Sequence, residues 1–320
     1  MALVLQTDFA WADDSVERSV IEQAGHVLVS GPSTPMAAAW IEDFVARHDP
    51  QAIMTCWGEV TARAIAGPTD LRIVQRIGVG LDNIAVASAT LRGAWVANVP
   101  DYCVGEVSDH AVGLLLAWAR GIVAFDREAK LGGWNPASAR LRRVSDLTVG
   151  LVGYGRIGRA TASKLRAFGC RLLVNAPSAR TDDLVCATLL EDLLAQSDVV
   201  ILHAPLTSQT HHLIDARRLS GMRPGAFLIN VSRGPMVDNQ ALLDALESGR
   251  LSGAGLDVIE GEPAPPRALM ERPDVVITPH VAFSSEASLI ELRRRAAEEV
   301  VRVLAGHAPR HACNRPDLRS

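Results

Sequence analysis

The sequence predicts an α/β protein made of two domains, each built on a doubly wound parallel sheet. Its 320 residues exceed the size of one typical domain and suit two. Short β-branched runs alternate with helical patterns along the whole chain, which favours parallel strands with helices on both faces. A glycine-rich turn at residues 153–158 lies near the middle, so a continuous domain is expected to precede it.

The first hundred residues contain five candidate strands with helical patterns between them. The segment MAAAWIEDFVARH (36–48), for example, has apolar residues at helical spacing. The runs that we expect to form strands are ALVLQ (2–6), HVLVS (26–30), AIMTC (52–56), LRIVQRI (71–77) and AWVAN (94–98).

One long helix is expected from about Val104 to Lys130, where Gly132 and Gly133 end it. A last helix is expected over residues 286–306, before an irregular tail; it either finishes the second domain or returns to the first. The second series of strands, between these two helices, comprises LTVGLV (147–152), CRLLV (170–174), DVVILH (198–203), AFLINV (226–231), GAGLDV (253–258) and VVITP (275–279).

Composition and charge exclude several classes of protein. The net charge is −4, the chain has two lysines and its arginines are scattered, so the sequence has no basic cluster of the kind that binds nucleic acid. Five widely spaced cysteines without a CxxC pair indicate reduced thiols in a cytoplasmic protein. The N-terminus lacks the basic segment of a signal peptide, and the apolar run at 111–119 is too short to span a membrane. We therefore expect neither nucleic acid nor a membrane as partner.

The glycine turn GYGRIG predicts a site for a dinucleotide. It follows a strand and opens a helix, and a second strand comes next within about 30 residues, as a Rossmann unit requires. Its glycines allow a tight turn, close approach of a pyrophosphate and close packing of helix on strand, while the helix N-terminus favours phosphate. The predicted contacts are Gly153, Tyr154, Gly155, Arg156, Ile157 and Gly158.

The end of the second strand of this unit departs from the usual pattern. A carboxylate that binds the adenosine ribose is expected about 18–20 residues beyond the turn, but Ala176 stands there. Asn175 can still bond a hydroxyl, whereas Ser178 and Arg180 can meet a 2′-phosphate. The cofactor is thus NAD(P)H, with discrimination against NADP relaxed or reversed. Alternatively, Arg180 points to solvent and NAD binds more weakly through backbone contacts.

Arg233, Glu262 and His280 follow three successive strands of the second series. Ligands of parallel sheets bind beyond the carboxyl ends of the strands, so these side chains can converge on one site. An arginine binds a carboxylate or polarises a carbonyl, a histidine exchanges a proton near neutral pH, and a carboxylate orients the histidine. With a hydride from the cofactor, this set suits reduction of a 2-keto acid.

In these stretches the chain resembles the D-isomer-specific 2-hydroxyacid dehydrogenases. The segment 100–122 is similar to the branch that includes the C-terminal-binding-protein corepressors. The matching stretches, in the order of the family, are RIGVGLDNI (76–84), GYGRIG (153–158), LHAPLTSQTHHLI (202–214), GAFLINVSRGPMVDNQALLDALESGRLSGAGLDV (225–258), GEP (261–263) and TPHVAFSS (278–285).

The resemblance implies a role for each matched residue. Arg233 binds and polarises the substrate, His280 is the acid/base and Glu262 is its partner. Asp257 contacts the nicotinamide side, and Val79 and Gly80 offer backbone N–H groups to the substrate carboxylate. Trp57, after a first-domain strand, is a candidate for substrate specificity, although core packing is slightly favoured. The remaining predicted cofactor contacts are Ala204, Pro205, Thr210, Val231 and Ser232.

The resemblance also implies an architecture. A flavodoxin-like substrate domain comprises residues 1–99 and 286–320, and a Rossmann cofactor domain comprises residues 100–285, with a cleft between them. The helix at 104–130 contributes to a homodimer interface. The substrate is a small 2-keto acid, reduced to a D-2-hydroxy acid.

Two other functions remain open on the sequence. One is a dinucleotide-sensing, corepressor-like binding protein with little turnover, against which the intact arginine, glutamate and histidine argue. The other is an enzyme on the same scaffold that oxidises formate or phosphite.

No metal site is predicted from the sequence. Glu106 and His110 share a helical face but lack a third ligand, so a local hydrogen bond or surface pair is expected. His203 is expected to pack or to take part in catalysis, and His211 and His212 are expected to be loop residues.

Overall fold

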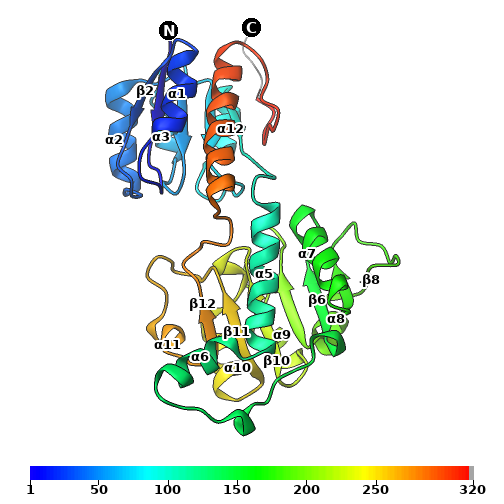
Figure 1. The fold of residues 1–320 in the computed structure, drawn as a ribbon. Helices are drawn as coiled ribbons and strands as arrows, with labels where there is room; N and C mark the ends of the chain where they lie inside the picture. Colours follow the sequence, from blue (N-terminus) through cyan, green and yellow to red (C-terminus); the bar gives the residue numbers. More distant parts are fainter. Residues whose placement is uncertain (317–320) are drawn as a thin grey trace. The chain divides into compact units, whose positions relative to one another are not determined.

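The computed structural model describes residues 1–316 and divides the chain into two compact units. Unit 1 is Met1–Tyr102 together with the chain from Ser285 onward, and unit 2 is Cys103–Ser284. Each unit contains one all-parallel sheet with helices (Figure 1), which confirms the predicted fold class. The first predicted domain ran to residue 320, and its last four residues lie outside the described part of the chain.

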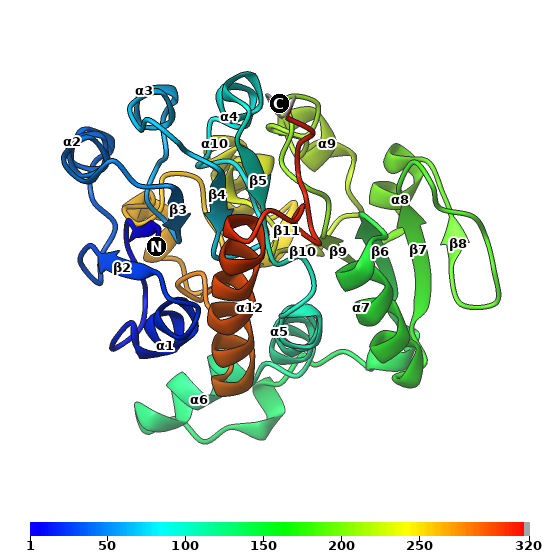
Figure 2. The same cartoon turned by 90° about the horizontal axis from the view of Figure 1, so that it is seen from above.

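Unit 1 is built on a five-stranded sheet in the order β2-β1-β3-β4-β5. Helices α2, α3 and α4 lie on one side of the sheet, and α1 and α12 lie on the other (Figure 2). Its strands are β1 (Leu3–Gln6), β2 (Val27–Ser30), β3 (Ala52–Thr55), β4 (Ile73–Arg76) and β5 (Trp95–Ala97). Its helices are α1 (Ser15–Gln23), α2 (Ala38–His48), α3 (Ala62–Ala66), α4 (Val86–Arg92) and α12 (Glu286–Leu304).

All five strands predicted for the first hundred residues are present. Strands β3 and β4 are fully buried, because their apolar runs are covered by helices on both faces. The buried Arg293 of α12 forms a bidentate ion pair with the fully buried Glu17 of α1, with an Nη2–Oε2 distance of 2.7 Å. The pair ties the last helix to the first helix within unit 1.

Unit 2 is built on a seven-stranded sheet in the order β12-β11-β10-β9-β6-β7-β8. Helices α5 and α7 lie on one side of this sheet, and α8, α9 and α10 lie on the other (Figure 2). The strands are β6 (Thr148–Val152), β7 (Arg171–Asn175), β8 (Cys186–Ala187), β9 (Val199–Leu202), β10 (Ala226–Asn230), β11 (Leu251–Leu256) and β12 (Val275–Ile277).

The predicted strands of the second series are all found, and the two-residue strand β8 is an addition. The order of the strands reverses at β6, whose neighbours are β7 and β9; such a switch point is where parallel sheets bind ligands. The connecting helices are α7 (Arg156–Ala167), α8 (Leu190–Gln196), α9 (Ala216–Gly221), α10 (Asn239–Glu247) and α11 (Arg267–Met270), with short 3₁₀ turns η1 (Pro136–Ser138), η2 (Val144–Asp146) and η3 (Gly234–Met236).

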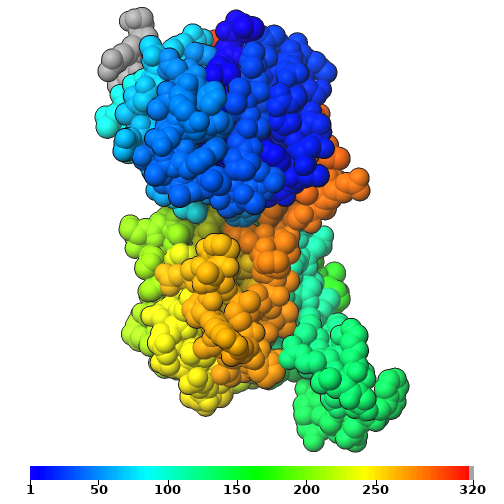
Figure 3. Space-filling view, turned by 90° about the vertical axis from the view of Figure 1, so that its left-hand side faces the viewer, coloured from blue at the N-terminus to red at the C-terminus, as the bar shows by residue number. Residues whose placement is uncertain are grey.

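The single long helix predicted for residues 104–130 is wrong, because the structure has two helices there. Helix α5 (Val104–Ala119) and helix α6 (Ile122–Lys130) meet at a bend of 59°. Gly121 lies between them with φ +61°, a left-handed conformation that glycine adopts without strain and that interrupts a helix. Helix α6 has no buried residue, and this segment stands out from the rest of unit 2 in Figure 3.

Within the described residues 1–316, no single helix is both long enough and apolar enough to span a membrane. The bent pair α5 and α6 passes that test only when the two helices are taken together. Helix α5 packs against α7 and against strands β10 and β11, so its apolar residues belong to the core of unit 2.

The partly buried His203, whose Nε2 atom is enclosed, makes the stability of unit 2 depend on pH. His203 follows β9, and its Nε2 atom is buried without a hydrogen-bond partner among the described residues. Burial lowers the pKa of His203 to about 4, because a charged imidazole loses its hydration there. As the pH falls below about 6.5, the unfolded chain takes up the proton first, and the folded state loses stability until the pH nears 4.

We expect a fall from pH 7 to pH 5 to remove about 2 kcal/mol of unfolding free energy through this one group. The neutral variant His203→Gln should lack that part of the pH dependence. Urea unfolding of both proteins at the two pH values measures it, with the exposed His307→Gln as the matched control. Equal pH dependence in the wild type and in His203→Gln would contradict the assignment.

Candidate active site and cofactor site

Arg233, Glu262 and His280 lie beyond the carboxyl ends of three neighbouring strands. Arg233 follows β10, Glu262 lies in the loop after β11, and His280 follows β12. Because the sheet order is β12-β11-β10, the three loops that carry these residues are adjacent at one edge of the sheet.

The structure brings His280 and Glu262 into direct contact. His280 Nδ1 donates a hydrogen bond of 2.7 Å to Glu262 Oε1. This bond fixes the orientation and the tautomer of the ring, so that Nε2 is the nitrogen that faces a reaction partner. The backbone of His280 is left-handed, with φ +53°, and its N–H donates to the Asp257 carbonyl at 2.8 Å. A non-glycine residue held in this region is common where function requires one orientation.

Asp257 anchors the loop that carries His280. Its carboxylate is 2% exposed and accepts hydrogen bonds from the Thr278 hydroxyl (2.6 Å) and from the backbone N–H groups of Val281 (2.9 Å) and Ala282 (3.0 Å). His110 of α5 lies 2.9 Å from the Thr278 hydroxyl through Nε2. The sequence analysis paired His110 only with Glu106 and therefore did not predict its contact with Thr278. The contact of Asp257 with the nicotinamide stays a prediction beside this structural role.

Arg233 is placed by close packing of the loops after β10 and β11. Its Nη1 donates to the Ser232 carbonyl at 2.8 Å, and its own carbonyl accepts from Asn230 Nδ2 at 2.9 Å. At the next residue, Gly234, a Cβ atom would lie 2.3 Å from the carbonyl carbon of Ile259. Only glycine permits this approach, which sets the Arg233 loop against the loop that leads to Glu262.

The glycine turn between β6 and α7 has the form of a pyrophosphate cradle. Gly153 has φ +102°, and a Cβ there would lie 2.5 Å from the backbone nitrogen of Ala204. A Cβ at Gly158 would lie 2.4 Å from the Gly153 carbonyl oxygen, which explains the close packing of α7 on β6. Gly155 differs, because its backbone is extended and a Cβ would meet no atom within 4 Å. The bare backbone there faces open space at the helix N-terminus, which fits a bound pyrophosphate.

After β7, two of the side chains predicted to contact the adenosine ribose or its phosphate are hydrogen-bonded to backbone carbonyls. Asn175 Nδ2 donates to the Thr188 carbonyl at 2.9 Å, and the exposed Arg180 donates to the Ala179 carbonyl at 2.7 Å. Ala176 is partly exposed and directly follows the strand, which ends at Asn175.

Two further charged residues near this loop were missed by the sequence reasoning. The Arg159 guanidinium lies 4.4 Å from the ring centroid of Tyr154. Burial raises the pKa of Tyr154; the negative charge of Asp182 raises it further, and the positive charge of Arg159 opposes the rise. Arg159 could have been predicted from its position directly after the glycine turn, whereas no neighbouring sequence pattern indicated Asp182.

The other predicted cofactor contacts lie on two loops that are bonded to each other. The Ser232 hydroxyl donates to the Ala204 carbonyl, which links the loops after β10 and β9. Thr210 Oγ1 donates to the Pro205 carbonyl at 2.7 Å, and Val231 is buried.

The predicted substrate contacts Trp57, Val79 and Gly80 lie in unit 1, beyond the ends of β3 and β4. The fully buried Asp8 accepts a hydrogen bond of 2.6 Å from the Trp57 N–H. Arg76 donates from Nε to the Gly80 carbonyl at 3.0 Å, and its guanidinium lies 5.7 Å from the Trp57 ring centroid. Asp8 and Arg76 thus position these loops. Arg76 opens the matched stretch RIGVGLDNI, whereas Asp8 belongs to none of the matched stretches.

Residues 112–282 match the sequence profile of the NAD-binding domain of D-isomer-specific 2-hydroxyacid dehydrogenases. The chain belongs to this family. It is 36% identical over 271 residues to a glyoxylate reductase of Thermofilum pendens, across 82% of this chain and 80% of the relative. It is 34% identical to a D-3-phosphoglycerate dehydrogenase of Synechocystis, of which it spans 57%. The TT0316 protein of Thermus thermophilus superposes with a TM-score of 0.89 at 32% identity, covering 98% of this chain and 100% of that structure.

Membership of the 2-hydroxyacid dehydrogenases confirms the resemblance that the sequence indicated. The chain is an NAD(P)-dependent oxidoreductase that acts on CH–OH donors, and it interconverts 2-keto acids and D-2-hydroxy acids.

Proposed function

We propose that this dehydrogenase reduces a small 2-keto acid to the D-2-hydroxy acid through Arg233, Glu262 and His280. The observation that carries the proposal is the bond of 2.7 Å between His280 Nδ1 and Glu262 Oε1, beside the loop of Arg233. A relative at 36% identity is named glyoxylate reductase, and this name supports a small substrate for the present chain.

Each residue of the site has a separate task in this reaction. Arg233 binds the substrate carboxylate or polarises the keto group with its planar guanidinium. His280 gives a proton from Nε2 to the carbonyl oxygen, while Glu262 holds the Nδ1 proton and stabilises the ring. Asp257 keeps the His280 loop in place through its three hydrogen bonds. The bound dinucleotide supplies the hydride.

The proposal extends to the cofactor, for which we propose use of both NADH and NADPH. Ala176 brings no carboxylate to repel a 2′-phosphate, and Arg159 and Arg180 bring positive charge to the neighbourhood of the loop. Asp182 lies in the same loop and limits the preference for NADPH, because its negative charge opposes a phosphate.

A panel of 2-keto acids with both cofactors tests this function. We expect turnover of glyoxylate, hydroxypyruvate or pyruvate to a D-product where the product is chiral, and values of kcat/KM for the two cofactors within about tenfold of each other. Arg159→Ala should lower kcat/KM with NADPH more than with NADH, and Arg166→Ala, in the last turn of α7, is the control.

Two outcomes of the panel would contradict the proposal separately. Absence of turnover with every keto acid, despite measurable NADH binding, would favour the corepressor-like binding protein. An NADH preference above about a hundredfold would refute the dual cofactor use alone.

The proposed enzyme is a cytoplasmic homodimer with the segment around α5 and α6 at its interface. The exposed apolar side chains of this segment support the proposal: Ile122, Leu131 and Trp134 are 57%, 83% and 89% exposed. Exposed apolar groups gathered on one segment are typical of interaction surfaces.

A further inference from the structure

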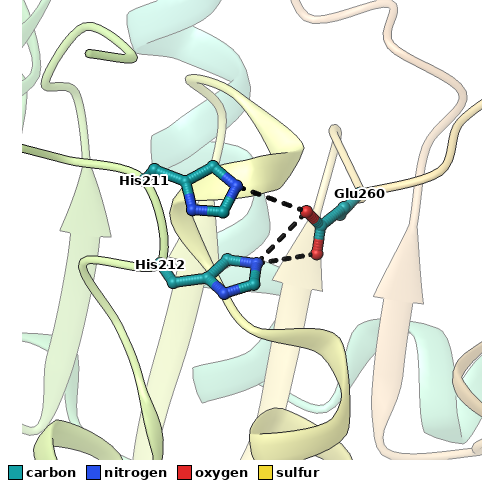
Figure 4. Close-up of side chains that lie close together, drawn as sticks. All are labelled: His211, His212 and Glu260. Atoms are coloured by element: carbon teal, nitrogen blue, oxygen red, sulfur yellow. Dashed lines mark hydrogen bonds and ion pairs between the residues drawn. The ribbon is translucent and has the colours of Figure 1, made fainter. Parts of the chain in front are cut away.

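We propose that His211, His212 and Glu260 form a binding site for a divalent transition-metal ion, with zinc as the best fit. The three side chains gather in unit 2 beside the loop that carries Glu262 (Figure 4). The sequence analysis predicted no metal site and treated both histidines as loop residues that follow a turn. Glu260 lies 48 residues from His212 along the chain.

The separations between His212 Nε2 and the Glu260 oxygens are close to those around a tetrahedral ion, and His211 Nε2 lies somewhat farther out. Zinc binds nitrogen and oxygen at about 2.0–2.2 Å, which places neighbouring ligands of a tetrahedron about 3.3 Å apart. His212 Nε2 lies 3.1 Å and 3.0 Å from the two Glu260 oxygens, and His211 Nε2 lies 3.8 Å from Oε1. All three ligand atoms fall within 4.8 Å of one another. Small side-chain movements therefore suffice to seat the ion.

The backbone around the cluster is fixed before any ion arrives. The His212 N–H donates to the Pro235 carbonyl at 2.8 Å, and the left-handed conformation of His212, with φ +46°, turns its ring beside that of His211. The two rings stack at a centroid distance of 4.1 Å. Asn239 Nδ2 donates to the Glu260 carbonyl at 2.9 Å. Preorganised ligands lose little entropy on binding.

An acidic side chain behind His212 supports metal binding further. Asp238 Oδ2 lies 4.0 Å from His212 Nδ1, and the other oxygen of Asp238 is held by the backbone N–H groups of Gln240 and Ala241. At this distance the carboxylate is no hydrogen-bond partner of the ring, but its negative charge favours a cation nearby. With Glu260, Asp238 supplies two negative charges, which offset those of a divalent cation.

The exposure of the cluster indicates how the ion is reached. The side chains of His211, His212 and Glu260 are 53%, 36% and 32% exposed, so an ion can approach from solvent. Three protein ligands leave a fourth position for water or a small anion, as in zinc sites with an open coordination position. Imidazole and carboxylate ligands suit zinc, nickel and cobalt better than magnesium or calcium.

The experiment titrates the chelator-treated, full-length protein with Zn²⁺ by calorimetry and with Co²⁺ by visible absorption. We expect one ion per chain and the intense visible bands of tetrahedral cobalt. His211→Ala and His212→Ala should each weaken binding by at least about a hundredfold, and Asp238→Asn, which keeps the helix cap, should weaken it by a smaller factor.

Two control variants separate this cluster from other ligands. The exposed His307→Ala and the exposed thiol variant Cys186→Ser should bind the ion as the wild type does. Circular dichroism in the presence of chelator establishes that every variant is folded. Unchanged affinity in His211→Ala and His212→Ala, or no stoichiometric binding by the wild type, would show a simple histidine–glutamate ion pair and overturn the proposal.

Discussion

Replacing His280 by asparagine is expected to lower kcat by about 10²–10⁴-fold, the range that one general acid supplies. The loss follows because asparagine occupies the place of the ring but cannot donate a proton to the developing alkoxide. NADH affinity, measured by fluorescence quenching, should stay near that of the wild type, since the glycine turn lies between β6 and α7, and β10, β11 and β9 separate β6 from β12, the strand that precedes His280.

Arg233→Ala is expected to have a comparable effect on kcat/KM, because no other group replaces its bidentate contact with a carboxylate. Steady-state kinetics of both variants, with the exposed His307→Asn as control, measure the two roles. Retention of more than about a tenth of the wild-type rate by both variants would refute the assigned roles, because loss of a general acid alone exceeds that factor.

Valine at Gly155 is expected to weaken NADH binding by about 10–100-fold with little change in melting temperature. Because a Cβ at Gly155 meets no protein atom within 4 Å, the added side chain enters only the space that we assign to the pyrophosphate. Overpacking of a filled site typically costs about 1–3 kcal/mol, which corresponds to this loss of affinity.

Valine at Gly153 is the matched comparison, and we expect it to destabilise the fold itself. Gly153 has φ +102°, and its Cβ would lie 2.5 Å from Ala204 N, so Gly153→Val should unfold at a clearly lower temperature even without cofactor. Thermal unfolding and NADH titration of both variants give the two readouts. Wild-type NADH affinity in Gly155→Val would show that the open space is not the pyrophosphate site.

Most strands could be predicted because their signals are local. Runs such as AIMTC and DVVILH are apolar over their whole length, as expected for strands covered on both faces. The break at Gly121 was missed, since the apolar pattern continues through 111–119 and a single glycine in a helical pattern does not always end a helix. Strand β8 was missed because two residues show no periodicity.

The candidate site was predictable where a motif carries it and not elsewhere. Arg233, Glu262 and His280 were found from strand ends and family spacing, and the structure adds the His280–Glu262 bond. The Asp8–Trp57 bond and the His110–Thr278 contact had no such signal. Each joins residues far apart in the chain whose types are common in any protein.

The sequence by itself determined the two parallel-sheet units, the glycine turn and the family, because hydrophobic period and turn chemistry depend on residues close together in the chain. Only the tertiary structure decided which loops touch: Gly234 against Ile259, Asp257 under the His280 loop, and Glu260 beside His211 and His212. These contacts arise from the order of strands in the sheet, which is set by packing of the whole core and leaves no mark on any short stretch of sequence.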